Sequence, residues 1–209
     1  MRIAGFVPLS LCDFPGRVAS VIFTQGCNFR CPWCHNGHLL SSDLEREKLI
    51  PEEEVLARLE ARKVQVPGIV VSGGEPTVQP DLTEFLQKLK DMGMEVKLDT
   101  NGSRPDLLKL FFERHLVDFV AMDIKAPWSG YARLVGLKTL PTERLRESVR
   151  LIAASGVEHQ FRTTRVDPLL DADDYEEILR QIPEGSPHVW QKFRPEYSLD
   201  PALRPPKKG

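Results

Sequence analysis

Three closely spaced cysteines are the feature that most constrains this chain. Cys27, Cys31 and Cys34 fall within eight residues, directly after an apolar segment, and they are three of the chain's four cysteines. Thiolates at this spacing on one short loop can converge on a soft metal centre, and iron–sulfur clusters are held by such cysteines. A four-iron cluster with three cysteine ligands leaves one iron open to bind a small molecule. The spacing therefore predicts a reactive iron–sulfur site.

Disulfides and zinc are the alternative uses of these cysteines. The sequence shows no signal peptide and no apolar run as long as a membrane span, which predicts a cytoplasmic protein with reduced thiols and no membrane association. The spacing alone leaves a zinc site open, since Cys31 and Cys34 could combine with His35 or His38 and a further cysteine. A binding module that is stabilised by zinc or carries a cluster is thus the non-enzyme alternative. Cys12 lies outside the cluster spacing and is interpreted as a small loop residue.

The motif around the cysteines resembles the radical S-adenosylmethionine (SAM) enzymes, in which an aromatic residue, here Trp33, precedes the last cysteine. Residues 26–36, together with residues 10–16, resemble the activating proteins of glycyl radical enzymes, and most closely those of anaerobic ribonucleoside-triphosphate reductase. The resemblance covers residues 3 to about 165. It implies a [4Fe-4S] cluster on the three cysteines and SAM at the open iron.

Length and charge limit the organisation of the chain. With 209 residues and 41% hydrophobic content, we expect one domain over residues 1–200. Residues 201–209 carry three prolines and two lysines and are expected to form a flexible tail. A net charge of −2 gives no basic excess for phosphate contacts, so nucleic acid is not an expected partner.

Strand and helix patterns alternate along the chain. The expected strands are residues 18–24, 68–71, 96–98, 119–124, 159–164 and 189–193, and the expected helices are residues 51–62, 82–92, 107–116, 142–155 and 173–182. Such alternation predicts a mostly parallel α/β sheet with ligands at the carboxyl ends of its strands. Periodicity leaves a doubly wound sheet possible, whereas the resemblance implies a partial (β/α)6 barrel, open on one side, and we adopt the barrel.

A second motif follows the strand at residues 68–71. Gly73, Gly74 and Glu75 stand in the sequence Ser-Gly-Gly-Glu-Pro. Alone, this is an ordinary turn at the end of a strand. After the cysteine loop it resembles the methionine-binding motif of the family, which implies that backbone groups and Glu75 meet the ammonium group of SAM.

Charged residues stand at the ends of the next two strands. Asp99 follows one of them, and Asp123 and Lys125 alternate so that their side chains point the same way. A structural ion pair is one interpretation. The resemblance instead implies a SAM-lining role, with Lys125 suited to the SAM carboxylate and with a monovalent cation at the two aspartates left open. Whether Arg162 takes part is also left open.

The aromatic neighbours of the third cysteine complete the predicted site. The resemblance implies that Trp33 lies against the adenine of SAM, although packing at the barrel rim is also possible. His35 could support the cofactor or make a hydrogen bond within the loop.

The resemblance also implies a reaction and its partners. A reduced cluster cleaves SAM to a 5′-deoxyadenosyl radical, which abstracts a hydrogen atom from a glycine of a glycyl radical enzyme, expected to be the anaerobic ribonucleotide reductase. A flavodoxin or ferredoxin would supply the electron under anaerobic conditions. The alternatives are a small-molecule enzyme similar to 7-carboxy-7-deazaguanine synthase and an activase of another glycyl radical enzyme, such as a pyruvate formate-lyase type.

Overall fold

The sheet is built from strands that follow one another in sequence order. The structure is a computed structural model that describes residues 1–40 and 48–206. Within these residues the strands are β1 (Ile3–Ser10), β2 (Ala19–Thr24), β3 (Gly68–Gly73), β4 (Glu95–Thr100), β5 (Phe119–Asp123), β6 (Glu158–Arg165) and β7 (His188–Lys192). β1 pairs antiparallel with β2, and β2 to β7 run parallel. Each parallel neighbour therefore requires a crossover connection.

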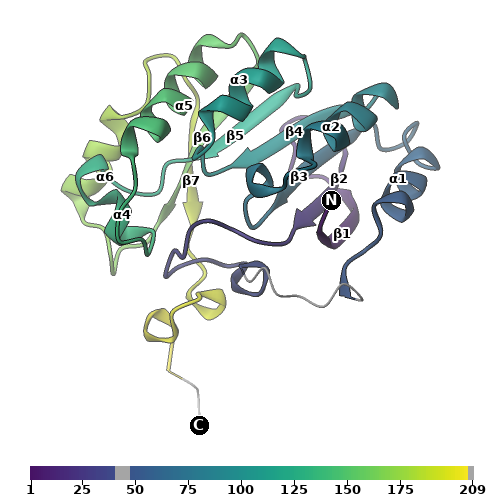
Figure 1. Ribbon diagram of the computed structural model, residues 1–209. Coiled ribbons are helices and arrows are strands. Elements are labelled where there is room, and N and C mark those ends of the chain that lie inside the picture. Colours follow the sequence, from purple (N-terminus) through teal and green to yellow (C-terminus); the bar gives the residue numbers. More distant parts are fainter. Residues whose placement is uncertain (41–47, 207–209) are drawn as a thin grey trace.

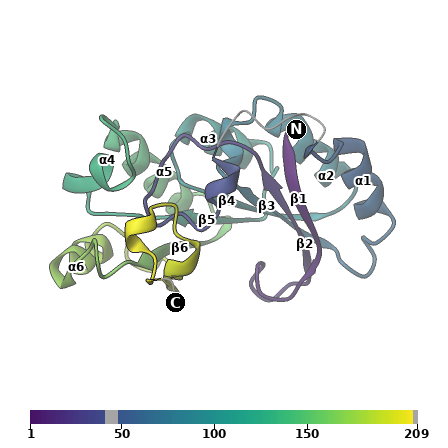
Figure 2. The same ribbon diagram turned by 90° about the horizontal axis from the view of Figure 1, so that it is seen from below.

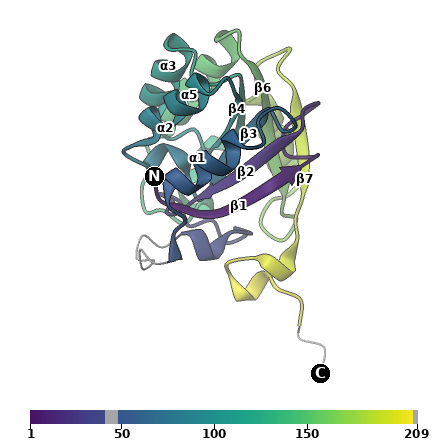
Figure 3. The same cartoon turned by 90° about the vertical axis from the view of Figure 1, so that its right-hand side faces the viewer.

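Helices supply these crossovers on one side of the sheet. They are α1 (Glu52–Glu60), α2 (Leu82–Asp91), α3 (Pro105–Glu113), α4 (Tyr131–Leu134), α5 (Thr142–Ala154) and α6 (Ala172–Arg180). Figure 3 shows α1, α2, α3 and α5 together on one face. The strand order lacks the reversal of a doubly wound sheet, and in the described residues β1 and β7 are unjoined edges of a curved sheet (Figures 1 and 2). The prediction of a partial barrel, open on one side, is confirmed.

The elements expected from periodicity are all present, with ends shifted by a few residues. Two of the strands and α-helices named above were not expected. β1 contains Gly5 and Pro8, which are unfavourable within a strand, but β1 is an edge strand and tolerates them. Its register with β2 shifts before Gly5 and after Val7. α4 is a single turn of four residues, too short to show a helical period.

The alternation of side chains gives the sheet two different faces. The helix-covered face carries the larger apolar cluster, which includes Ile22, Val71 and Leu98. The opposite, inner face carries a small apolar cluster made of Phe14, Ala19, Val21, Val70, Phe119 and Ala121. Further along the same strands, this inner face becomes polar at the carboxyl ends. The small cluster thus closes the base of the barrel interior and leaves its upper end for a ligand.

The chain after β7 returns to the cysteine loop. In Figure 1 this segment lies below the sheet, and the N–H of Asp200 donates to the carbonyl of Pro32 at 2.8 Å. Pro201–Leu203 form a 3-10 turn. Residues 207–209 lie outside the described residues, and the flexible tail expected over 201–209 stays a prediction. No helix in the described part of the chain has the length and hydropathy needed to cross a bilayer.

Candidate cluster and cofactor site

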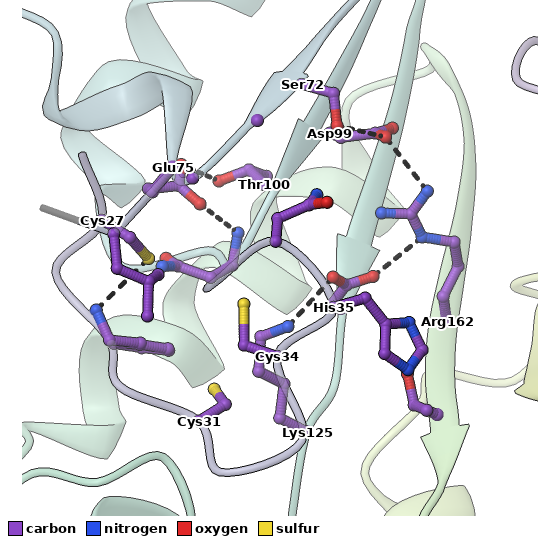
Figure 4. Close-up of a pocket in the computed structure, with 18 of the residues that line it drawn as sticks. Cys27, Cys31, Cys34, His35, Ser72, Glu75, Asp99, Thr100, Lys125 and Arg162 are labelled. Carbon is purple, nitrogen blue, oxygen red and sulfur yellow. Dashed lines mark hydrogen bonds and ion pairs between the residues drawn. The ribbon is translucent and has the colours of Figure 1, made fainter. Parts of the chain in front are cut away.

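A cavity of about 300 Å³ lies at the carboxyl ends of the parallel strands. Every residue that the sequence analysis assigned to the cluster or to SAM lines it: Cys27, Cys31, Trp33, Cys34, His35, Gly73, Gly74, Glu75, Asp99, Asp123 and Lys125. Figure 4 shows the three cysteines on the loop at one side of this cavity, with Asp99 and Arg162 across from them. Residues from four different loops and strand ends therefore meet where the fold is expected to bind ligands.

The cysteine loop is held by its own backbone and by the segment after α4. The Arg30 side chain donates to the carbonyls of Cys27 and Phe29 at 2.6 and 2.8 Å, and the Arg30 N–H donates to the carbonyl of Val135 at 2.9 Å. The neighbouring Gly136 has φ +72°, and a Cβ there would lie 2.4 Å from the Arg30 carbonyl oxygen. This close approach fixes the middle of the loop against the body of the protein.

Burial raises the pKa of two of the thiols. Desolvation, with a contribution from the Glu75 carboxylate, raises the pKa of Cys27 to about 11. Desolvation also raises the pKa of Cys31 to about 12, although the Lys125 ammonium group opposes the shift. With these raised pKa values, the thiols of Cys27 and Cys31 stay protonated at neutral pH until a metal binds. Because the thiolate is the form that binds metal, the positive charge of the metal must displace the thiol protons.

The donor set fits an iron–sulfur cluster. The three thiols border one cavity, and Cys27 Sγ accepts the Phe29 N–H at 3.3 Å, a bond of the kind that tunes cluster sulfurs. Among the described His, Cys, Asp and Glu side chains, no three converge on one point as the ligands of a single metal ion do. Cys12 is exposed on the β1–β2 connection and is not among the described residues that line the cavity.

The Gly-Gly turn packs against the start of the cysteine loop. The Gly74 N–H donates to the Thr24 carbonyl at 3.0 Å. A Cβ at Gly74 would lie 2.1 Å from the Gly26 carbonyl oxygen, and one at Gly73, where φ is +128°, would lie 2.1 Å from the Thr24 nitrogen. The glycines are thus required by backbone packing between two loops, a reason that the motif alone did not reveal.

Glu75 is buried beneath this turn, with 1% of its surface exposed. Its Oε1 accepts from the N–H and hydroxyl of Thr77 at 3.1 and 2.5 Å and from the Thr100 hydroxyl at 2.7 Å. Its Oε2 accepts from the Asn101 N–H at 2.6 Å. Burial raises the pKa of the carboxyl, and these bonds oppose the shift. The side chain therefore joins the turn to the end of β4, and its contact with SAM stays a prediction.

Five charged side chains form a continuous chain across the inner face, and Figure 4 labels three of them, Asp99, Arg162 and Lys125. Arg162 Nε donates to Asp123 Oδ1 at 2.8 Å, and Arg162 Nη1 lies 3.2 Å from Asp99 Oδ2. Lys125 Nζ donates to the other oxygen of Asp123 at 3.0 Å, and Lys97 Nζ pairs with the other oxygen of Asp99. The ion pair considered from sequence for Asp123 and Lys125 is present, and it lines the cavity.

These contacts keep both carboxyl groups ionised. Burial opposes ionisation of Asp123, but the charges of Arg162 and Lys125 outweigh it and lower its pKa to about 2. Burial likewise opposes ionisation of Asp99, and Arg162 and Lys97 lower its pKa. The pKa values of Lys125 and Arg162 are raised by the same carboxylates against the cost of burial. At neutral pH Asp99 and Asp123 are thus ionised beside the charged groups of Arg162 and Lys125.

Trp33 and His35 flank the third cysteine in different surroundings. Trp33 is 4% exposed and packs into the large apolar cluster while it also borders the cavity. His35 stacks on Phe193, with ring centroids 5.8 Å apart, and its Nε2 accepts the Arg194 N–H at 3.1 Å. His35 therefore accepts a hydrogen bond, but its donor lies in the chain after β7 and not within the cysteine loop. Neither contact tests the predicted roles toward SAM.

Sequence reasoning missed other residues that connect the site. Lys97 is one of them and is buried, with 1% of its surface exposed. Alternation within β4 places it on the same face as Asp99, and this was the available signal. Asn28 in the cysteine loop exchanges hydrogen bonds of 2.8 Å with the side chains of Asn101 and Ser103. These amides tie the loop to the end of β4. The Asn-Gly turn after β4 was visible in the sequence, but its partner in the loop was not.

Comparison with known proteins identifies the superfamily. The family model described as the radical SAM superfamily matches residues 21–182, which hold the cysteine loop and most of the cavity. The chain belongs to the radical SAM superfamily. This radical SAM enzyme thus has a [4Fe-4S] cluster and SAM as its cofactors, as its sequence predicted.

Its sequence relatives include activating enzymes. A Methanocaldococcus jannaschii protein named a glycyl-radical enzyme activating enzyme is 32% identical over 95% of this chain and 82% of its own length. The pyruvate formate-lyase-activating enzyme of Staphylococcus aureus is 35% identical over 56% of this chain and 50% of its own. The 7-carboxy-7-deazaguanine synthase of Methanopyrus kandleri is 33% identical over 56% of this chain and 53% of its own. This radical SAM enzyme thus groups with the activases, and it spans about half the length of the latter two relatives.

A solved structure shares the fold. Streptococcus suis SuiB bound to S-adenosylmethionine superposes with a TM-score of 0.67, at 14% identity, over 90% of this chain and 43% of SuiB. At this identity the likeness concerns the fold, and it supports the partial barrel of the radical SAM enzyme.

Proposed function

We propose that this radical SAM enzyme activates a glycyl radical enzyme and that its partner is anaerobic ribonucleoside-triphosphate reductase. The observation that carries the proposal is the similarity to an activating enzyme along 95% of the chain. The choice of partner is supported by residues 10–16 and 26–36, which resemble the activating proteins of that reductase. When bound, the cluster and SAM supply a radical that takes a hydrogen atom from a glycine Cα.

The residues of the cavity divide this task. Cys27, Cys31 and Cys34 hold the cluster, since their thiols border the cavity from one loop. Lys125 binds the SAM carboxylate, because its ammonium group lines the cavity and, among the described residues, donates a hydrogen bond only to Asp123, although it carries three donors.

The remaining assigned residues shape the SAM pocket. Trp33 offers an indole face to the adenine, and His35 fixes the end of the cysteine loop. Gly73 and Gly74 present backbone groups to the amino end of SAM, while Glu75 fixes their turn. Asp99 and Asp123 hold the charged groups that face the cofactor.

The surroundings of the reaction follow from its chemistry. The open side of the barrel admits a glycine-containing loop of a large partner. Reduction requires an external one-electron donor, for which we propose a flavodoxin or ferredoxin. Reduced thiols and a cluster require a reducing compartment, so we place the enzyme in the cytoplasm as one domain over residues 1–200.

Two other substrates have specific support. The relative from Methanopyrus kandleri favours a small molecule as for 7-carboxy-7-deazaguanine synthase, and the relative from Staphylococcus aureus favours pyruvate formate-lyase as partner. Both matches cover 56% of the chain, against 95% for the Methanocaldococcus jannaschii relative, and this difference supports our choice.

Electron paramagnetic resonance tests the proposal directly. The enzyme is reconstituted anaerobically, reduced with dithionite, and mixed with SAM and purified anaerobic ribonucleotide reductase or pyruvate formate-lyase. A glycine-centred doublet with the reductase, absent with Cys31→Ser and retained with Cys12→Ser, is the expected result. A doublet only with pyruvate formate-lyase would replace the partner, and 5′-deoxyadenosine without any doublet would favour a small-molecule substrate.

A further inference from the structure

The two aspartates of the cavity already have a cation between them. Sequence reasoning left open a monovalent cation at Asp99 and Asp123. In the structure the guanidinium of Arg162 lies there, with Nε 2.8 Å from Asp123 Oδ1 and Nη1 3.2 Å from Asp99 Oδ2. Both carboxylates thus meet the same delocalised cation.

All four carboxylate oxygens face donors of the protein. Besides Arg162, Asp99 receives Lys97 on Oδ1 and the Ser72 hydroxyl on Oδ2 at 3.0 Å, and Asp123 receives Lys125 on Oδ2 at 3.0 Å. Alkali-metal ions, like other hard cations, bind through oxygen atoms. A metal ion here would have to displace an existing donor and would face three cations of the protein.

The strand register builds this arrangement. Arg162 on β6 pairs directly opposite Asp123 on β5, and Asp99 on β4 pairs with Ala121 on β5, two residues earlier. From that position the long Arg162 side chain contacts Asp123 and also extends to Asp99 (Figure 4 labels Arg162 and Asp99). The side chain is 13% exposed and is bound at two nitrogens, which restricts it to one position.

We propose that Arg162 is the fixed counter-cation of Asp99 and Asp123, so that SAM binding by this enzyme requires no monovalent metal ion. Arg162 is a positioning residue: it orients the two carboxylates and, through Asp123, the Lys125 ammonium group that faces the cavity. This inference rests on the proposed SAM site. With Arg162 in place the five charged groups sum to +1, and removal of Arg162 leaves two carboxylate oxygens, Asp99 Oδ2 and Asp123 Oδ1, without their guanidinium partner.

Calorimetric SAM binding to the cluster-loaded enzyme tests the inference. Titrations are made in potassium chloride, sodium chloride and choline chloride at equal ionic strength. We expect the wild-type dissociation constant to agree within about twofold among the three salts. Arg162→Ala should bind SAM about tenfold more weakly in choline, consistent with loss of a charge-assisted contact, and potassium or sodium should restore at least part of that loss. Arg162→Lys keeps a cation and should stay independent of the salt.

Arg165→Ala is the matched control, because Arg165 lies on the same strand but is 56% exposed and stacks on Tyr175. It should bind SAM as the wild type does in every salt. Wild-type binding that strengthens more than about fivefold with potassium or sodium would overturn the inference, and this comparison does not depend on the folding of any variant. Equal weakening of a folded Arg162→Ala in all salts would also overturn it, since a purely structural residue gives that result. Absence of SAM binding to the wild type in every salt would instead overturn the proposed SAM site.

Discussion

The backbone N–H of Glu75 donates to the carbonyl of Gly26 over 2.9 Å, and this bond joins the turn after β3 to the residue that precedes the first cluster cysteine. A second bond, from Gly74 to Thr24, runs beside it at 3.0 Å. The two loops therefore behave as one unit. The position of Cys27 depends on a turn about fifty residues further along the chain, and changes in that turn should reach the cluster.

Gly74→Ala should reduce cluster binding. The new Cβ would lie 2.1 Å from the Gly26 carbonyl oxygen, closer than any real contact, so the cysteine loop must move. We expect a loss of stability of at least about 2 kcal/mol, as for an overpacked interior, and less than half of the wild-type iron content after reconstitution. Iron analysis and urea unfolding of the apo-protein measure the two effects.

Gly5→Ala is the control for this change. A Cβ at Gly5 would meet no atom closer than 3.4 Å, an ordinary contact with Phe23. It should keep iron content and stability near wild type. Full iron content in Gly74→Ala would show that the loop does not depend on the turn.

Glu75→Gln should destabilise the protein although it preserves shape. Each carboxylate oxygen accepts a backbone N–H, from Thr77 at 3.1 Å and from Asn101 at 2.6 Å, so an amide nitrogen in either position faces a backbone donor. An unsatisfied buried donor costs about 2 kcal/mol. Urea unfolding of the apo-protein should show this loss, whereas the exposed Glu84→Gln should change stability by less than about 0.5 kcal/mol. Equal stability of the two variants would contradict the assigned contacts.

The sequence predicted the cavity because local patterns determine which residues end each strand. The cysteine loop, the Gly-Gly turn and Asp123 with Lys125 all lie at carboxyl ends, and parallel strands bring those ends together. Local patterns did not predict which charged side chains pair with one another. Arg162 lies more than sixty residues from Asp99, and only the strand register places them together. A lysine in a strand is expected to be exposed unless it is paired, and the pairing of Lys97 with Asp99 is seen only in the structure.

Local signals also did not reveal the structural reasons for some residues. Gly73 and Gly74 leave space for the backbone of the cysteine loop, a packing role that their motif does not show. The described hydrogen bonds of Glu75 go to Thr77, Thr100 and Asn101, and its contact with SAM stays a prediction. Such roles depend on contacts between distant segments, which a motif does not contain.

Acid should destabilise the apo-protein through Asp123. The charges of Arg162 and Lys125, acting against burial, lower its pKa from an ordinary 3.8 to about 2. A carboxyl group with a lowered pKa stabilises the fold above its unfolded pKa, and this stabilisation is lost as the pH falls from about 4 to about 2. The loss is on the order of 2 kcal/mol. Asp123→Asn should be less stable at neutral pH, because two buried cations lose a partner, yet its stability should fall less over this range. Urea unfolding at several pH values measures both slopes, and parallel curves would contradict the prediction.

His35 should hold the chain after β7 against the cysteine loop through one hydrogen bond. Burial, with the nearby Arg194 charge, lowers the pKa of the imidazole, so its Nε2 is free to accept the Arg194 N–H at neutral pH. His35→Phe keeps the stacking on Phe193 but removes the acceptor, whereas His35→Gln keeps an acceptor and removes the ring. We expect faster amide exchange over residues 194–204 in His35→Phe, by about fivefold for a bond worth about 1 kcal/mol, and a smaller change in His35→Gln. Hydrogen–deuterium exchange with mass spectrometry measures it. A larger increase in exchange in His35→Gln than in His35→Phe would show that ring stacking, and not the hydrogen bond, holds the segment. The same segment is also bound to the cysteine loop by the hydrogen bond from the Asp200 N–H to the carbonyl of Pro32, which lies between the second and third cysteines. The exchange rates therefore also report how this segment supports the cluster loop.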